Sequence, residues 1–496
     1  MDKTVILNYI KRHLGTSPRQ TAEVAKLTIL LMMTLLAITA TASTKMKYPG
    51  GRQYVWRLTL TDKHESHYQL ERPQRWLSAQ SVERRRRQGL ALDSTDLPVS
   101  PYYLKLLRQH KGISVVGQSR WMNTVLVRMK DTTIVDSLRR IGFVCRAEHV
   151  WTSPDSIERQ PDYRYYERFQ AWDSVRGQLY GGGREQIETV SGHRLHAIGL
   201  RGKGMTIAVL DGGFQNADRI PALRKANVEG THDFVRQVCG GMALSLPPEQ
   251  SVFRQIDHGT KVLSAMATNE PEVLVGTAPE AHFWLLRCED TVTEQPVEED
   301  LWVMAAELAD SAGVDIINSS LGYNEYDKPH ESYRLGALDG QTAFISRAAS
   351  LLAGKGIVLV NSAGNNGMGQ WKKINVPADA DNILTVGALD RHGRLAPFSS
   401  VGNTQDGRTK PDVVALGSPA VLIGGRGTVN REMGTSFSTP VVCGLVACLW
   451  QAMRQKTATE IIELVRRCGS QHDRPDNVYG YGTPNFWRAY MIGKME

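Results

Sequence analysis

The sequence predicts an α/β protein whose main domain is built on a mostly parallel, buried sheet, preceded by a small α+β domain. Two observations predict this architecture. From about residue 204 onward, short runs of Val, Ile and Leu alternate with helix-like segments, and the runs carry no polar alternation. Strands of this kind are buried on both faces, and strands that alternate with helices form parallel sheets. Near the N-terminus, by contrast, the segment 54–60 alternates apolar and polar residues, as a half-buried strand does.

The small domain shows the order strand, helix, two strands, helix, strand. The expected elements are a strand at 54–60, helical patterns around 73–88 and at 102–109, strands at 112–116 and 124–129, a helix at 131–141 and a strand at 143–150. This order is the split βαβ pattern of ferredoxin-like domains, and the additional helical segment is an elaboration of it.

The main domain supplies the residues that are candidates for chemistry. Its expected strands lie at 205–210, 282–287, 314–318, 356–361 and 383–388, with helical segments at 262–266, 301–311, 342–352 and 441–453. In open parallel sheets, ligands bind beyond the carboxyl ends of the strands. Residues that directly follow these strands are therefore the first candidates.

The N-terminal region carries a targeting pattern. An apolar stretch from Leu27 to about Ala42 follows Lys26 and ends in Ala-Thr-Ala, a small-x-small cleavage pattern that predicts a secretory signal. An uncleaved membrane anchor is the alternative, but the apolar core is shorter than the ~20 residues that a spanning helix needs. We expect export to the periplasm, cell envelope or extracellular space, with no stable membrane insertion after the signal is removed.

The chain is expected to divide into four segments. They are a signal peptide at 1–43, the small domain at 50–151, a connector at 152–180 and the main domain at 181–490. The connector is polar, with Pro154, Pro161 and clustered Tyr and Arg residues. This composition favours an exposed segment that proteases can reach.

Charge is distributed unevenly along the chain. The formal net charge is +8, but residues 181–496 hold 30 Lys and Arg against 35 Asp and Glu, which leaves 29 against 16 before them. Opposite charges suit two parts that dock on each other, and they do not suit one basic groove for phosphates. We therefore expect no nucleic-acid partner. The run Arg84–Arg87 is expected to be a solvated helix face, with a processing site or a polyanion contact as alternatives.

Six cysteines are present, and none shows metal-type spacing. Cys443 and Cys448 lie in an apolar helical stretch and are expected to be small buried hydrophobes. Sequence alone leaves the pairing of the cysteines open.

Two polar residues follow buried strands directly. Asp211 closes the strand at 205–210 and precedes two glycines, and Asn365 follows the strand at 356–361 within Ser-Ala-Gly-Asn-Asn-Gly. Asp and Asn are also common turn residues, so neither one is specific when taken alone. Their shared position at one edge of a parallel sheet is what makes them candidates.

Two further residues stand at helix starts. His258 precedes an apolar helical pattern, and Ser436 precedes a long apolar helix whose first turn is expected to hold Pro440. The positive end of that helix favours negative charge near the serine oxygen. A surface histidine and an N-cap serine, with Ser438 or Thr439 as equal cap candidates, are the ordinary alternatives.

The four groups together satisfy the requirements of one reaction. A serine hydroxyl needs an imidazole to take its proton, the imidazole needs a carboxylate to fix its tautomer, and the resulting oxyanion needs hydrogen-bond donors. The chain supplies these groups in the order Asp, His, Asn, Ser. This is the Asp, His, Ser order of the subtilisin arrangement.

The chain resembles the subtilases, the subtilisin-like serine peptidases. The resemblance covers about residues 180–481 and rests on Ala-Val-Leu-Asp-Gly-Gly at 208–213, His-Gly-Thr at 258–260, Ala-Gly-Asn at 363–365 and Gly-Thr-Ser at 434–436. It implies a subtilisin-like three-layer fold and a catalytic triad of Asp211, His258 and Ser436. It also implies an oxyanion hole formed by the Asn365 side chain and the Ser436 backbone N–H.

The resemblance extends to substrate and partners. It implies protein or peptide substrates that pair with Ser320, Leu321 and Gly322, with Ala363 and Gly364 as further substrate-binding residues. The small domain resembles the inhibitory propeptides of the family, and the overall layout is similar to that of Bacteroidetes subtilases. This resemblance implies a zymogen that cuts itself in the connector. No cofactor is required. Structural calcium is compatible with the family, although its calcium loops do not map clearly onto this chain.

Two other functions are alternatives to peptide hydrolysis. A catalytically inactive subtilase that acts as a binding protein is one alternative, although no triad member is missing. An esterase on an α/β-hydrolase fold is the other. The sequence around Ser436 lacks the second glycine of G-x-S-x-G, and those enzymes place the histidine last.

Overall fold

The structure is a computed structural model that describes residues 45–64, 66–158, 176–240 and 251–496. The chain divides into two compact units, of which the smaller comprises 1–48 and 155–162 and the larger the rest. In the smaller unit, β1 (Lys45–Lys47) pairs antiparallel with β6 (Ser156–Glu158). The predicted signal peptide and most of the predicted connector lie outside the described residues.

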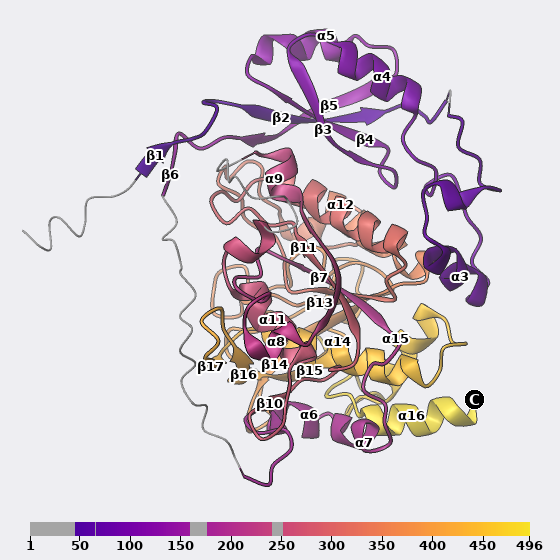
Figure 1. The fold of residues 1–496 in the computed structure, drawn as a ribbon, viewed down its shortest axis with the longest axis vertical. Coiled ribbons are helices and arrows are strands. Elements are labelled where there is room, and N and C mark those ends of the chain that lie inside the picture. Colours follow the sequence, from indigo (N-terminus) through magenta and orange to yellow (C-terminus); the bar gives the residue numbers. More distant parts are fainter. Residues whose placement is uncertain (1–44, 65, 159–175, 241–250) are drawn as a thin grey trace, which may run out of the picture. The chain divides into compact units, whose positions relative to one another are not determined.

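The larger unit contains the predicted ferredoxin-like sheet. Its strands are antiparallel neighbours in the order β3-β4-β2-β5. They are β2 (Tyr54–Leu60), β3 (Ile113–Ser119), β4 (Thr124–Met129) and β5 (Val144–Thr152). The helices α4 (Pro101–Gln109) and α5 (Val135–Arg139) cover one face of this sheet (Figure 1). The predicted element order is therefore confirmed, with a shorter second helix than expected.

The main sheet has seven strands within the described residues, and all neighbours are parallel. Their order is β15-β14-β13-β12-β7-β11-β8. The strands are β7 (Thr206–Asp211), β8 (Asn227–Asp233), β11 (His282–Arg287), β12 (Ile316–Ser319), β13 (Val358–Ser362), β14 (Leu384–Asp390) and β15 (Val413–Ser418). This confirms the predicted α/β class. The strands β8 and β15 were not predicted.

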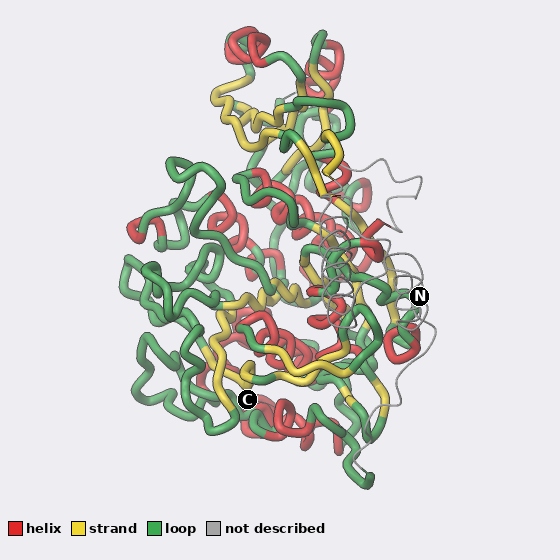
Figure 2. The backbone as a smooth tube through the Cα atoms, turned by 90° about the vertical axis from the view of Figure 1, so that its left-hand side faces the viewer, coloured by secondary structure: helices red, strands yellow, loops and turns green. Residues whose placement is uncertain are grey.

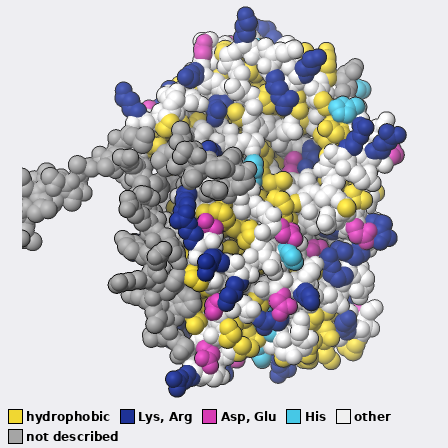
Figure 3. Space-filling view, viewed as in Figure 1, with side chains coloured by type: hydrophobic (Ala, Val, Ile, Leu, Met, Phe, Trp, Pro, Cys, Tyr) yellow, Lys and Arg dark blue, Asp and Glu magenta, His cyan; other side chains and the backbone are white. Residues whose placement is uncertain are grey.

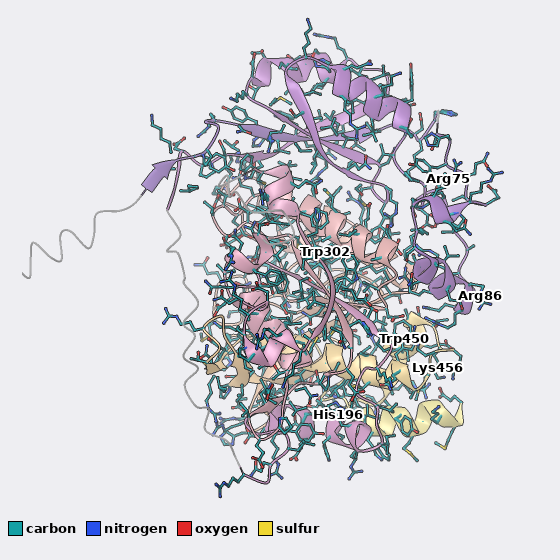
Figure 4. The ribbon with its side chains drawn as sticks, in the orientation of Figure 1. Arg75, Arg86, His196, Trp302, Trp450 and Lys456 are labelled. Atoms are coloured by element: carbon teal, nitrogen blue, oxygen red, sulfur yellow. The ribbon has the colours of Figure 1, made fainter. Side chains whose placement is uncertain are left out.

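Helices pack on the main sheet, and Figure 2 shows its strands running between them. The longer helices are α11 (His258–Ala267), α12 (Val297–Ala312), α13 (Phe344–Leu351), α14 (Thr435–Gln451), α15 (Ala458–Arg467) and α16 (Phe486–Met495). Shorter elements are α6 (Arg184–Glu188), α7 (Gly192–Ala197), α8 (Pro221–Arg224), α9 (Phe234–Val238), β9 (Asn269–Glu270), β10 (Leu274–Val275), β16 (Ala420–Ile423) and β17 (Val429–Glu432). Trp302 of α12, labelled in Figure 4, is buried and donates from Nε1 to the Ser319 hydroxyl on β12 over 3.0 Å.

The helix α14 begins earlier than the sequence indicated. It starts at Thr435, so Pro440 is the sixth residue of the helix and not part of the first turn as predicted. Proline has no N–H to donate to the carbonyl four residues before it. The Ser436 carbonyl instead accepts a hydrogen bond of 2.9 Å from the Ser320 hydroxyl. The N-cap position belongs to Gly434, so the alternative of Ser436 as an N-cap is also wrong.

The arginine run lies on the helix α3 (Ala79–Arg87), and the prediction of a solvated face is wrong for two of its members. Arg84 and Arg85 have side chains only 1% and 3% exposed. They share a face with Ser81 and Gln88, because residues at i, i+3, i+4 and i+7 lie on one side of a helix. That face packs on the main domain, where Arg84 donates to the carbonyls of Val314 (2.6 Å) and Lys355 (3.1 Å).

The opposite face of α3 behaves as predicted. Arg86 is 74% exposed, pairs with Glu83 and is labelled at the edge of Figure 4. Arg84 and Arg85 are therefore not accessible as a dibasic processing site, whereas Arg86 and Arg87 are not buried. Figure 3 shows that Lys and Arg side chains on the face of the molecule turned to the viewer are spread among acidic and uncharged ones.

All six cysteines lie in described segments, and none of them is in a disulfide. Cys443 and Cys448 are fully buried in α14, as predicted. Within the described ranges, no helix is long and apolar enough to cross a membrane.

Candidate active site

Asp211 and His258 form a hydrogen-bonded pair at the carboxyl edge of the main sheet. Asp211 is the last residue of β7 and is fully buried, whereas His258 is the first residue of α11. The His258 Nδ1 atom lies 2.9 Å from Asp211 Oδ2 and 3.0 Å from Oδ1. The carboxylate therefore accepts from Nδ1–H, which leaves Nε2 of the imidazole for a second partner.

This pairing changes the acidity of His258. Burial disfavours the imidazolium, but the charge and hydrogen bond of Asp211 outweigh burial and raise the pKa of His258 to about 9. The ring also contacts Phe437, with centroids 5.6 Å apart. Since Phe437 follows Ser436 directly, this contact holds the imidazole beside the start of α14.

Ser436 is in the first turn of α14 and lines the same cleft as His258. In this structure its hydroxyl donates to the Ser320 carbonyl over 3.3 Å. The Ser320 hydroxyl donates back to the Ser436 carbonyl, so the end of β12 and the start of α14 are joined in both directions. Within the described residues, the Ser436 hydroxyl makes no hydrogen bond to the His258 ring.

Asn365 follows β13 and is exposed in the cleft. Its Oδ1 atom accepts from the backbone N–H of Thr435 (2.9 Å) and from the Thr435 hydroxyl (3.0 Å). A backbone N–H only donates, so the amide oxygen must face Thr435. The Nδ2 donor therefore faces the other way and is available to a bound group.

The cleft has a volume of about 420 Å³. Of the predicted substrate-binding residues, Ser320, Leu321, Gly322 and Gly364 line it. Ala363 does not, because its side chain is fully buried and its backbone N–H and carbonyl bond to Val386 and Asn375. The structure thus brings together all the predicted site residues except Ala363, which lies beneath the cleft wall.

Several lining residues were not predicted. They are Ile256, Glu289, Asn324, Ser362, Asn366, Asn375 and Thr435. Glu289 had a signal in the sequence, because it follows the predicted strand at 282–287 and so reaches the same sheet edge as Asp211. Asn375 had none, since it comes from a loop that only the tertiary fold brings to the cleft.

Structural calcium stays a prediction. The described segments contain no group of three or more His, Cys, Asp or Glu residues that could hold a metal ion. No step of the chemistry below depends on one.

Comparison with known proteins places this fold and cleft in a family. A model described as "Subtilase family" matches residues 202–482, and one described as "Peptidase S8 propeptide domain, Bacteroidota" matches residues 55–164. The thermophilic serine proteinase of Bacillus sp. (strain AK1) is 30% identical over 58% of this chain and 61% of its own length. The membrane-bound transcription factor site-1 protease of Homo sapiens is 25% identical over 62% of this chain and 27% of its own length. The match thus spans less than two thirds of either relative.

Among solved structures, the epidermin leader peptide processing serine protease of Staphylococcus aureus superposes with a TM-score of 0.61. It is 17% identical, and the match covers 90% of this chain and 100% of that one. At this identity the likeness supports the fold alone. The family match covers more than half of the chain and agrees with the parallel sheet and the cleft at its carboxyl edge. The chain therefore belongs to the subtilase family of serine peptidases and carries an N-terminal propeptide domain.

Proposed function

We propose that this chain is an exported serine endopeptidase that hydrolyses peptide bonds through Ser436, His258 and Asp211, and that it is made as a self-processing zymogen. The observation that carries the proposal is the Asp211–His258 hydrogen bond at 2.9 Å in the same cleft as Ser436. This arrangement supplies a nucleophile, a base and the group that orients the base.

Each residue has a defined task in the proposed reaction. The Ser436 hydroxyl attacks the substrate carbonyl while His258 Nε2 takes its proton, and Asp211 stabilises the imidazolium that forms. The C–N bond then breaks as His258 returns the proton to the leaving amine. Water, activated by the same imidazole, hydrolyses the acyl-enzyme and regenerates the serine.

The oxyanion is held by two donors in this proposal. One is the Asn365 Nδ2 group, whose orientation is fixed by the two hydrogen bonds from Thr435. The other is the backbone N–H of Ser436, which lies in the first turn of α14, where N–H groups have no intrahelical partner. Both would act on charge that develops only during the reaction.

The N-terminal domain is proposed to inhibit the enzyme until it is cut off in the predicted connector. Its interface with the main domain supports this role. Arg57 is buried and donates two hydrogen bonds of 2.8 Å to Asp300 of α12. Arg120 pairs with Asp310 at 2.6 Å. The positive charge of the small domain and the negative charge of the main domain therefore meet in specific buried pairs.

The alternative of a catalytically inactive subtilase is tested by covalent labelling. We expect a fluorophosphonate probe to label Ser436 of the processed protein, because the probe requires an activated serine. The measurement is mass spectrometry of the labelled peptide, with hydrolysis of quenched-fluorescence peptides run in parallel. A processed, folded protein that takes no label and cleaves no peptide would support the inactive alternative.

Asn365→Leu is expected to lower kcat by roughly 10²–10³ with little change in KM. Leucine is similar in size to asparagine but has no N–H to donate to the oxyanion. The measurement is steady-state hydrolysis of one peptide, with active sites counted by fluorophosphonate titration. Asn227→Leu, at the exposed edge strand β8, is the matched control and should leave kcat unchanged. Full turnover by folded Asn365→Leu protein would contradict the role given to this amide.

A further inference from the structure

Glu289 is a charged residue of the cleft that the reaction above does not use. It is the second residue after β11, whose last residue, Arg287, is the register partner of Asp211. Its carboxylate lies directly over the turn that follows Asp211, since a Cβ atom built on Gly212 would come within 2.7 Å of Glu289 Oε2. It lines the cleft together with His258.

The Glu289 carboxylate is not held in an ion pair, although the charges of His258 and Arg287 act on it and lower its pKa. Within the described residues it makes no hydrogen bond or ion pair, and Arg287, the nearest arginine in sequence, is committed to Asp233 at 2.9 Å and to the Gly212 carbonyl. Burial, together with the neighbouring charge of Asp211, raises the pKa of Glu289 to about 7. A carboxylate held in this way gains stability from any cation that binds beside it.

Two further carboxyl groups, Glu294 and Glu298, are affected by the charge of Glu289. Burial and the charge of Glu289 raise the pKa of Glu294 to about 7, and burial with the charges of both raises the pKa of Glu298 well above its ordinary value. Glu298 Oε2 and the Tyr323 hydroxyl are buried without a hydrogen-bond partner among the described side chains. Ionisation of these carboxyl groups is therefore disfavoured, and a cation bound beside Glu289 would stabilise its ionised form.

The lining of the cleft is chemically mixed. Asn375 donates to the Gly322 carbonyl over 3.4 Å and accepts a hydrogen bond of 2.8 Å from Asn366, so this part of the lining is uncharged amide. His258 and Glu289 are the titratable members of the lining. The side chains of an extended peptide point alternately to opposite sides. Suppose that the side chain of the residue whose carbonyl is attacked lies against the amides beside Gly322. The side chain of the preceding residue then points to the opposite side, toward His258 and Glu289.

We propose that Glu289 is a specificity-determining residue that binds a lysine or arginine side chain of the substrate. That side chain belongs to the residue immediately before the one whose carbonyl is attacked. This inference rests on the proposed peptidase function. We expect a cationic side chain because the Glu289 carboxylate forms no ion pair within the described residues and two further acids, Glu294 and Glu298, are affected by its charge. It is a peptide side chain because the site opens into the cleft that holds the nucleophile.

The test compares peptides that differ at this one position. Quenched-fluorescence peptides would carry lysine, arginine, norleucine or glutamate there, and the full-length chain would be expressed and allowed to process before its active sites are titrated. Norleucine keeps most of the lysine stem and removes the charge. We expect kcat/KM for lysine to exceed that for norleucine by roughly 10- to 100-fold, and glutamate to be the poorest, because the contact is a charge-assisted hydrogen bond.

Substitution of Glu289 isolates the contact. Glu289→Gln keeps the shape of the side chain and should bring the lysine-to-norleucine ratio close to one. The readout is this ratio, because any effect of the lost charge on His258 acts on both peptides and cancels. Glu185→Gln is the matched control, since Glu185 is exposed on α6 and makes no side-chain hydrogen bond or ion pair within the described residues. It should leave the ratio unchanged.

The pH dependence provides a second readout that needs no variant. Glu289 is neutral when protonated, so the wild-type lysine-to-norleucine ratio should rise as pH increases through about 7. Taking the ratio cancels the ionisation of His258, which both peptides share. A ratio that is near one in the wild type at every pH would overturn the proposal, as would a high ratio that survives Glu289→Gln. Failure of the peptidase function itself is a different result, in which no peptide is cleaved and no serine is labelled.

Discussion

Ser436→Ala is expected to abolish peptide hydrolysis and to leave the precursor at full length. Loss of the nucleophile alone should lower kcat by about 10⁶, because a triad acts as a unit and the remaining oxyanion donors and binding residues supply only a small part of the acceleration. If the chain processes itself, the same substitution also stops removal of the N-terminal domain. The measurements are peptide hydrolysis and the intact mass of the purified protein.

Ser438→Ala is the matched control for this experiment. Ser438 lies two residues further along α14, is fully buried and donates to the Thr435 carbonyl over 3.0 Å. Its loss should cost some stability and leave processing intact. A mature product of normal size from Ser436→Ala protein would show that another protease cuts the connector. The proposal of self-processing would then fail, while hydrolysis by Ser436 would still be judged from the peptide assay.

Much of the fold could be predicted because burial on both faces leaves a direct trace in sequence. The runs around Ile207–Leu210 and Val358–Val360 are short, β-branched-rich and apolar at successive positions, which is typical of a strand buried on both faces of a layered sheet. The edge strand β8 left no such trace. Its sequence, Asn-Val-Glu-Gly-Thr-His-Asp, is largely exposed at the start, since an edge strand needs partners on one side only.

The candidate site followed from one topological rule and one chemical one. Asp211 and Asn365 were found because both follow buried parallel strands, and His258 and Ser436 because their chemistry completes the set. Glu289 obeys the same rule, yet its chemistry was not required by the reaction, so nothing in the sequence singled it out. Asn375 enters the cleft through a loop, and no local pattern encodes that approach.

The prediction of a solvated face for Arg84–Arg87 is wrong at Arg84 and Arg85 for a physical reason. Exposed charge runs are common, and a buried guanidinium is stable only when a specific partner compensates it. For Arg84 and Arg85 that partner is Asp310 of α12, more than 220 positions away in sequence. The periodicity of α3 shows which arginines share a face but not what that face meets.

Asp310→Asn is expected to lower the free energy of unfolding of the unprocessed protein by about 3–5 kcal/mol, because it leaves buried cations uncompensated. Asp310 is fully buried and forms ion pairs with Arg84, with Arg85 at 2.9 Å and with Arg120 at 2.6 Å. Burial alone would favour the neutral acid, but the three arginines hold the pKa of Asp310 well below its ordinary value. The measurement is urea unfolding in the Ser436→Ala background, which keeps the two domains joined.

The pH dependence of the free energy of unfolding provides a second readout for Asp310→Asn. A carboxylate whose pKa is depressed on folding contributes stability that is present above its unfolded pKa of about 4 and is lost as pH falls through the folded value. The difference between the parent protein and Asp310→Asn should therefore be constant from about pH 5 to 8 and shrink only in strong acid. Arg86→Ala, on the exposed face of the same helix, should change the free energy of unfolding by less than about 0.5 kcal/mol.

The location of the loss distinguishes an interface role from a local one. Two of the arginines, Arg84 and Arg85, belong to α3, and Arg120 follows β3, so all three leave with the N-terminal domain if it is cut off. In the processed protein Asp310 would then face water, and Asp310→Asn should cost little. An equal loss in both forms would mean that Asp310 stabilises α12 from within the main domain, and the arginine cluster would not be what holds the zymogen together. A loss confined to the precursor would identify this carboxylate as the centre of the domain interface.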